Sequence, residues 1–199
     1  MQKENKGLSF NLDSTIKMWQ EKNRVKKPVM LNLGSGGYEK KGWINHDQTK
    51  SKDVQVVHDL NRFPYPFKNE SIDVIYMSHV LEHLDNPVKV LNELHRIIKK
   101  SGLIIIRVPH YSGNSSWIDI THRRPYSALT LRSVNDAKWC RLYGLKKFTK
   151  VESRLGFWKR WFYPWNYIIE PLANLQVIYY EAVFANIFPP FEAIYIIEK

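Results

Sequence analysis

The chain has almost no cysteine: among its 199 residues only Cys140 carries a thiol. An internal disulfide is therefore excluded, and so is a metal site built on several thiolates. No apolar run approaches the roughly 20 residues that span a bilayer. The first six residues, Met1 to Lys6, are polar and lack the apolar stretch of a secretory signal. We expect a protein of the reducing cytoplasm.

Acidic residues are also scarce beside basic ones, since 30 lysines and arginines stand against 19 aspartates and glutamates, a net charge of +11. The excess is concentrated in residues 138–160, which hold eight basic side chains and one acid, Glu152. Such a segment suits a phosphate-bearing partner: a nucleotide-linked or pyrophosphate-linked substrate, an anionic lipid surface or a nucleic acid. A solvated basic face is the structural alternative.

What the chain does contain is an alternation of apolar strands and amphipathic helices. This pattern predicts one domain over residues 1–199, with a mostly parallel seven-stranded sheet and helices on its faces. Only nine residues, Gly34 to Gly42, separate the first two strands, so the first crossover is too short for an ordinary helix. The expected elements are a lead-in helix within residues 1–27 capped by Asp13 or Ser14, strands near 28–33, 43–46, 54–58, 71–77, 103–108, 146–153 and 191–198, and helices near 86–100 and 127–136.

A glycine-rich turn, Gly34 to Gly37, follows the first strand directly, and Asp47 follows the second. Glycine lets the backbone turn sharply and approach a ligand closely. An acid at the end of the neighbouring strand can accept hydrogen bonds from both hydroxyls of a ribose. The pair predicts the nucleoside half of a cofactor site at the carboxyl edge of the sheet, although a glycine-rich turn alone is more often only a turn. A dinucleotide is disfavoured because its pyrophosphate needs a full helix N-terminus.

Four segments, in this order and spacing, resemble class I S-adenosylmethionine-dependent methyltransferases, in particular the type-eleven-like members found among sugar and polysaccharide biosynthesis proteins. They are Leu31–Gly36, Trp43–Asp47, His58–Leu60 with Tyr65–Phe67, and Ser71–Leu84. The resemblance covers residues 28–125 and, more loosely, the final strand. It implies a Rossmann-like α/β sandwich of three layers, with S-adenosylmethionine as the cofactor. The sequence shows no cluster of metal-ligating residues, so we expect no metal.

The resemblance also implies individual roles. The glycine turn would pass close to the methionine and ribose of the cofactor, Asp47 would bind the ribose, and Asp59 would accept from the adenine amine unless it only caps a turn. Asn32 stands where the family often has an acid that helps to hold the methionine ammonium group. Glu82 and His83, just after the fourth strand, are expected to form a local hydrogen-bonded pair that orients the loop, which is a structural role. The expected cofactor-binding residues are Gly34, Ser35, Gly36, Asp47, Asp59, Leu60, Ser78 and His79.

Methyl transfer from a sulfonium is an in-line displacement, and a hydroxyl acceptor must also lose a proton. Histidine is a suitable base near neutral pH, and the expected catalytic candidates are His122, His79 and His110. Residues 110–126 are expected to form the acceptor-side loop. Its segment 119–124 resembles an Asp-x-Thr-His segment of the subgroup: Asp119 would fix the tautomer of His122, and Arg123 or Arg124 would hold an anionic substrate group. A loop-shaping role is the alternative.

The predicted function is O-methylation of a sugar, glycan or related small molecule. RNA methylation is favoured less, because Ser78-His79-Val80-Leu81 stands where an Asn-Pro-Pro-Tyr-type amine site would follow the fourth strand. A nucleoside-binding protein without catalysis is the third alternative. Residues 157–186 form an aromatic and basic insertion, with seven aromatic residues in the eleven of Phe157–Tyr167. These rings either pack on the sheet, cover the acceptor pocket or form a homodimer contact, or they bind peripherally to the inner membrane face.

Overall fold

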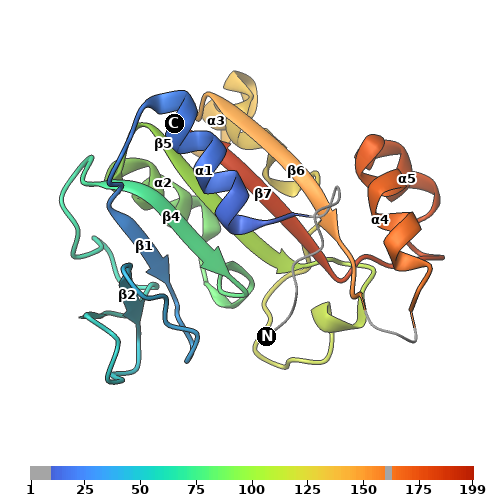
Figure 1. Ribbon diagram of the computed structural model, residues 1–199, viewed down its shortest axis with the longest axis horizontal. Helices are drawn as coiled ribbons and strands as arrows, with labels where there is room; N and C mark the ends of the chain where they lie inside the picture. Colours follow the sequence, from blue (N-terminus) through green and yellow to red (C-terminus); the bar gives the residue numbers. More distant parts are fainter. Residues whose placement is uncertain (1–9, 160–162) are drawn as a thin grey trace.

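A seven-stranded sheet is the frame of the molecule, as Figure 1 shows for the computed structural model, which describes residues 10–159 and 163–199. Its strands are β1 (Met30–Leu33), β2 (Ile44–Asp47), β3 (Val56–Val57), β4 (Ile72–Ser78), β5 (Ile98–Pro109), β6 (Lys150–Gly156) and β7 (Glu192–Glu198). They lie in the order β3-β2-β1-β4-β5-β7-β6. The first five strands are parallel, and β7 runs antiparallel to both β5 and β6. The prediction of a mostly parallel seven-stranded sheet is confirmed.

Helices cover both faces of this sheet. They are α1 (Leu12–Asn23), α2 (Pro87–Ile97), α3 (Ala137–Tyr143), α4 (Asn166–Leu175) and α5 (Val177–Val183), with short 3-10 helices η1 (Leu81–His83), η2 (Asn114–Ser116) and η3 (Thr130–Asn135). Side chains alternate along β4, so Val74 and Tyr76 pack with Trp19 of α1, whereas Ile75 and Met77 join the core on the side of α2. Figure 1 shows α1 crossing one face and α2 behind the other. The three-layer α/β sandwich is confirmed.

The crossover from β1 to β2 contains no helix, as its length predicted. The connections from β2 to β3 and from β3 to β4 also lack helices, which the sequence analysis did not foresee. Turns at the carboxyl ends of the strands replace them, and every residue from 34 to 71 is described. This half of the sheet is therefore open at its carboxyl edge, where a ligand can approach the backbone.

The helix expected over residues 86–100 is too long by about one turn. It begins after the N-cap Asn86 as predicted, but it ends at Ile97, and Ile98 is already extended and paired with Ile72 of β4. The next register pair joins Val74 to Leu103, so residues 99–102 form a bulge in β5. Strand pairing by a β-branched residue outweighs the helical pattern here. The cap of α1 is likewise Asn11, whose side chain accepts from the Ser14 N–H, and not Asp13 or Ser14.

The helix expected near 127–136 is also corrected. These residues form the 3-10 helix η3, and the α-helix that follows, α3, begins only after Asp136, whose carboxylate accepts from the N–H groups of Lys138 and Trp139. The sixth strand is shifted towards the C-terminus, to Lys150–Gly156, because its register is set by pairing with β7. In both places the sequence analysis relied on local helix or strand propensity alone.

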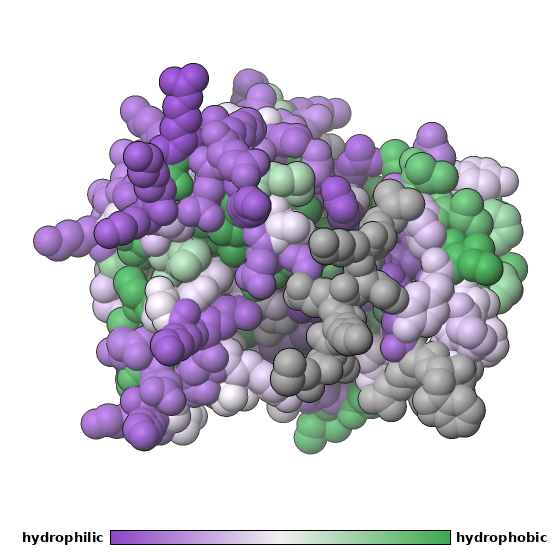
Figure 2. Space-filling model, in the orientation of Figure 1, coloured by the Kyte–Doolittle hydropathy of each residue, from purple (hydrophilic) through white to green (hydrophobic). Residues whose placement is uncertain are grey.

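The aromatic and basic insertion forms α4 and α5, at the end of the sheet beyond β6 and β7 (Figure 1). Figure 2 shows hydrophobic side chains gathered over this end, whereas the opposite end is mostly hydrophilic. In the part of the chain that the structure describes, no helix has both the length and the apolar character to cross a bilayer. Residues 160–162 of the aromatic segment lie outside the described residues. Exposed apolar side chains on α4 and α5 include Ile168, Leu172, Leu175, Ile178, Tyr179 and Val183.

Candidate active site

A cavity of about 460 Å³ lies at the carboxyl ends of β1, β2 and β4. This edge is where a parallel α/β sheet binds ligands, and the volume lies within the range of small-molecule sites. Polar and apolar groups contribute similarly to its wall. The lining residues are Gly34, Gly36, His46, Asp47, Gln48, His58, Asp59, Leu60, Asn61, His79, Val80, His83, Leu84 and Thr121.

The turn after β1 presents bare backbone to this cavity. Gly34 and Gly36 have φ angles of +69° and +54°, which residues with a Cβ rarely adopt. A Cβ placed on Gly34 would lie 2.4 Å from Cγ2 of Val80. The Ser35 N–H donates to the His46 carbonyl over 2.9 Å, which fixes the turn against β2, while the buried Ser35 hydroxyl has no protein partner among the described residues. The turn is shaped for close contact with a ligand.

Asp47 lies at the end of β2, as predicted, and organises the turn. Its Oδ2 accepts from the Gly36 N–H over 2.8 Å, and its Oδ1 accepts from the Thr49 N–H over 3.0 Å. Each carboxylate oxygen can accept a second hydrogen bond. The carboxylate therefore keeps acceptor capacity towards the cavity that it lines, which is what binding to a ribose diol requires.

The far wall of the cavity contains Asp59, Leu60 and two histidines. Asp59 caps the turn after β3, because its Oδ1 accepts from the Asn61 N–H over 2.9 Å, yet it also lines the cavity. His46 is fully buried, and neither ring nitrogen has a protein partner among the described residues. Burial, followed by the charge of nearby His58, lowers the pKa of His46 to about 4, so the ring is neutral. A neutral ring with unpaired nitrogens suits a heteroaromatic base.

Ser78 ends β4, and His79 follows it with a strained φ of +54°. The His79 ring enters the cavity with a carboxylate on either side: Nδ1 is 3.5 Å from Glu82 and Nε2 is 3.5 Å from Glu192. Burial alone would lower the pKa of His79, but these carboxylates outweigh it and raise the pKa to about 9. His79 is therefore an imidazolium at neutral pH. Glu192 is held in turn by Arg107 over 2.6 Å.

The loop over residues 110–126 brings Thr121 into the wall of the cavity beside His83, and the His122 ring lies 4.7 Å, centroid to centroid, from the His83 ring. Nδ1 of His122 lies 3.1 Å from the Ser116 carbonyl oxygen. A carbonyl only accepts hydrogen bonds, so Nδ1 carries a proton and donates it. The expectation that Asp119 fixes the His122 tautomer is wrong. Asp119 instead accepts from the Thr121 hydroxyl over 2.7 Å, because the short spacing folds into a local turn.

Several predicted residues are not among those that line this cavity: Ser35, Ser78, His110, His122, Arg123 and Arg124. His110 is fully buried, with Nε2 2.7 Å from Glu181 and Nδ1 2.9 Å from the Ser112 hydroxyl. Arg123 pairs with Asp85 over 2.8 Å, and Arg124 donates to the Leu84 carbonyl over 2.7 Å. These contacts fasten the loop to the segment after η1. The side chains named for an anionic substrate group are thus engaged in loop structure.

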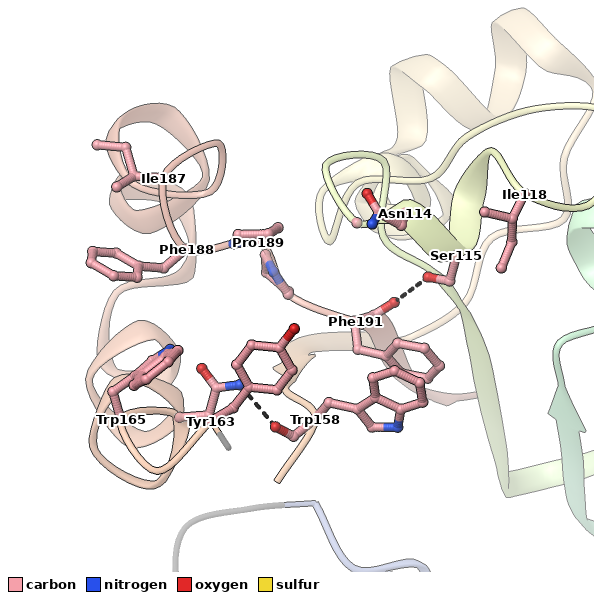
Figure 3. Close-up of a pocket in the computed structure, with 13 residues that line it drawn as sticks. Asn114, Ser115, Ile118, Trp158, Tyr163, Trp165, Ile187, Phe188, Pro189 and Phe191 are labelled. Carbon is pink, nitrogen blue, oxygen red and sulfur yellow. Dashed lines mark hydrogen bonds between the residues drawn. The ribbon is translucent and has the colours of Figure 1, made fainter. Parts of the chain in front are cut away.

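A second cavity, of about 430 Å³, lies between this loop and the C-terminal insertion (Figure 3). Its wall is mostly apolar, and Figure 3 shows the rings of Trp158 and Phe191 side by side within it. Their centroids are 4.9 Å apart and their planes are nearly parallel, at 6°. Phe191 also lies 5.9 Å, centroid to centroid, from His79. The aromatic segment therefore lines a pocket that adjoins the cavity at the glycine turn.

Two site features escaped sequence reasoning. Glu82 was assigned to a local pair with His83, but its carboxylate is buried and aimed between His79 and His122. The premise that the chain lacks a cluster of metal-ligating side chains is also wrong, because Glu82, His83 and His122 offer ligand atoms that all lie within 4.8 Å of one another. The sequence signal was the Glu-His dipeptide after β4; its partner lies 39 positions on, and only the fold joins them.

Comparisons with known proteins agree with this geometry. Residues 40–106 match the family model described as "Methyltransferase domain". A segment of 43 residues is 42% identical to an uncharacterized protein of Methanocaldococcus jannaschii, and this match spans 22% of the chain and 21% of that relative. A S-adenosylmethionine-dependent methyltransferase from Archaeoglobus fulgidus has a similar fold, with a TM-score of 0.59 at 19% identity over 94% of each chain. A Thermotoga maritima methyltransferase, described as a possible histamine N-methyltransferase, matches with a TM-score of 0.53 at 16% identity over 94% of this chain and 96% of its own.

The family match covers residues 40–106, and the solved structures share the fold of S-adenosylmethionine-dependent methyltransferases with this chain. The residues present fit S-adenosylmethionine, the cofactor that the sequence analysis expects. The glycine turn leaves space for a ligand, Asp47 keeps acceptor capacity for a ribose, and buried His46 and Ser35 have polar atoms without a partner among the described residues. The predicted fold is confirmed.

Proposed function

We propose that this protein is a methyltransferase that O-methylates a sugar, a glycan or a related small molecule. The observation that carries the proposal is the junction of the two cavities at His79 and Phe191. The cavity at the glycine turn would hold S-adenosylmethionine, and the aromatic cavity would hold the acceptor. An acceptor seated against Phe191 would lie beside the sulfonium, as in-line transfer requires.

The aromatic wall favours a ring-shaped acceptor with an apolar face. Trp158 and Phe191 present stacked rings, and Tyr163 and Trp165 complete the same wall. The C–H face of a pyranose packs on such a platform, and its hydroxyls remain free for recognition. The polar edge contributed by Asn114 and Ser115 suits those hydroxyls.

Methyl transfer to a hydroxyl breaks the bond between sulfur and the methyl carbon and forms a bond between carbon and oxygen. The hydroxyl loses its proton in the process. His79 is already charged, and His110 is enclosed, so neither suits the role of proton acceptor. His122 donates from Nδ1 to the Ser116 carbonyl, which leaves the lone pair of Nε2, and we propose His122 as the proton acceptor in the absence of a bound cation.

RNA is the less favoured acceptor. The basic segment lies on α3 and β6, at the opposite edge of the sheet from β2 and β3. RNA held along that segment would be separated from the cofactor cavity by the width of the sheet. Its last residue, Arg160, lies outside the described residues.

The test is a methyl-transfer screen with radiolabelled S-adenosylmethionine against nucleotide sugars, lipid-linked glycans and RNA. We expect label on a sugar-bearing acceptor and none on RNA. The variant Asp47→Ala should weaken cofactor binding by at least ~1 kcal/mol in calorimetry, because charge-assisted hydrogen bonds are lost. Asp53→Ala, an exposed aspartate outside the cavity, is the matched control and should bind as the wild type does. Labelling of RNA alone would overturn the proposed acceptor class.

A further inference from the structure

Three side chains beside the cofactor cavity form a cluster that methyl transfer from S-adenosylmethionine does not itself require. They are Glu82 and His83, from η1, and His122, from the acceptor-side loop. Their ligand atoms lie within 4.8 Å of one another. His83 lines the cavity together with Thr121, so one side of the cluster borders this cavity.

The Glu82 carboxylate is the first sign that the cluster binds something. The residue is 1% exposed, and neither carboxylate oxygen has a hydrogen-bond partner among the described residues. The Nδ1 atom of His79 is at ion-pair distance, 3.5 Å, and Nε2 of His122 is 4.0 Å away. The His79 imidazolium offers this carboxylate a charge but no hydrogen bond, and a cation bound directly to its oxygens would satisfy it.

The hydrogen bonds behind the two histidines are the second sign. The Thr121 hydroxyl donates its single hydrogen to Asp119, so towards Nδ1 of His83, 2.8 Å away, it can only accept. His83 therefore carries its proton on Nδ1, as His122 does towards the Ser116 carbonyl. Both rings keep a lone pair on Nε2. Metal-ligating histidines are oriented in this way: the ring nitrogen that does not bind the metal donates to a carbonyl, a carboxylate or water.

We propose that Glu82, His83 and His122 bind one divalent transition-metal ion, with an open coordination position towards the acceptor. Two imidazoles and one carboxylate match zinc sites that keep a fourth position for water or substrate. Mg²⁺ prefers six oxygen ligands and fits this donor set poorly. Thr121 and Asp119 are positioning residues, since they act on the ion only through His83.

The use of the open position rests on the proposed function. An acceptor hydroxyl bound there becomes more acidic, since a bound cation stabilises the alkoxide. The oxygen then forms the bond to the methyl carbon as the carbon–sulfur bond breaks. The hydroxyl proton passes to solvent, and S-adenosylhomocysteine leaves neutral at sulfur. His122 is then a ligand of the ion and not the base.

The test uses Co²⁺ as a spectroscopic probe on the full chain, after chelator treatment and without cofactor or acceptor. We expect visible absorption bands of a four- or five-coordinate ion that saturate near one equivalent and disappear when Zn²⁺ is added. Glu82→Gln and His122→Gln should each lower Co²⁺ affinity by at least about 100-fold. Thr121→Val should lower it by about 10- to 100-fold, the usual effect of losing an orienting partner.

His95→Gln is the matched control, because His95 lies on α2 outside the cluster; its Co²⁺ titration should equal that of the wild type. Thermal melts and cofactor titration show which variants fold, and Zn²⁺ should raise the melting temperature of the wild type but not of Glu82→Gln. Equal Co²⁺ affinity in Glu82→Gln and the wild type, or no saturable spectrum, would overturn the site. A metal-loaded protein that methylates no sugar would overturn the proposed function instead.

Discussion

The substitution Gly34→Ala tests whether the turn after β1 is shaped for its ligand by the absence of a side chain. Two costs follow from the geometry. The first is the φ of +69°, since the left-handed region costs a residue with a Cβ about 1–2 kcal/mol. The second is the overlap with Val80, whose Cγ2 would lie 2.4 Å from the new atom. Overpacking of this kind costs about 1–3 kcal/mol. Together they lower the free energy of unfolding by about 2–5 kcal/mol.

Gly36→Ala separates the two terms. Its φ is +54°, but a Cβ there would have no atom of the described residues within 4 Å, so only the backbone cost applies. Urea unfolding should therefore show Gly34→Ala to be less stable than Gly36→Ala by about 1–3 kcal/mol. The β-branched Val80 side chain has few rotamers with which to move away.

Val80→Ala in the Gly34→Ala background should restore most of that difference, as a double-mutant cycle measures. Calorimetry should show weaker S-adenosylmethionine binding in Gly34→Ala, because Gly34 and Val80 both line the cavity. Equal stability of the two alanine variants would refute the argument, since it would mean that the contact with Val80 does not constrain the turn.

Three further predictions concern other parts of the chain. The pKa of His46 is about 4 in the folded protein against an ordinary 6.5, so the unfolded state takes up the proton at a higher pH than the folded state. The free energy of unfolding should therefore fall by about 3 kcal/mol as the pH drops from 6.5 to 4. Urea unfolding of His46→Phe should show no such fall over this pH range. Hydrogen exchange of residues 110–126 should slow when cofactor and a sugar acceptor are added, because Trp117, Ile118 and Ile120 are exposed at the loop tip; equal protection in every state would contradict a ligand-ordered loop. The exposed apolar residues of α4 and α5 beside the basic segment predict pelleting with anionic vesicles at low salt and less at moderate salt, and no pelleting at low salt would favour a subunit contact.

Much of the cofactor half of the site could be predicted because its determinants are local. Gly36, in the turn after the first strand, and Asp47, at the end of the next strand, lie 11 positions apart. Parallel pairing of β1 with β2 brings both to the same edge of the sheet. The missing first helix followed from the nine-residue spacing, since chain length alone limits what a crossover can contain.

The acceptor half could not be read in the same way. Asp119 and His122 are three residues apart, yet a local turn sends the carboxylate to Thr121 and leaves His122 to the Ser116 carbonyl. His110 resembles a loop base in the sequence, but α5 covers it with Glu181. In both cases the partner of a histidine was chosen by packing between segments, which no spacing encodes.

By itself, the sequence determined the order of the elements, the parallel half of the sheet, the glycine turn and the position of Asp47, because periodicity and short-range spacing fix them. Only the tertiary structure decided where α2 gives way to β5, since strand pairing competes with helix propensity at Ile98. It also decided that Glu82 and His83 meet His122, and that Phe191 joins the aromatic segment to the cofactor cavity. Such contacts depend on which loops fold over the carboxyl edge, and that is settled by burial of the whole core.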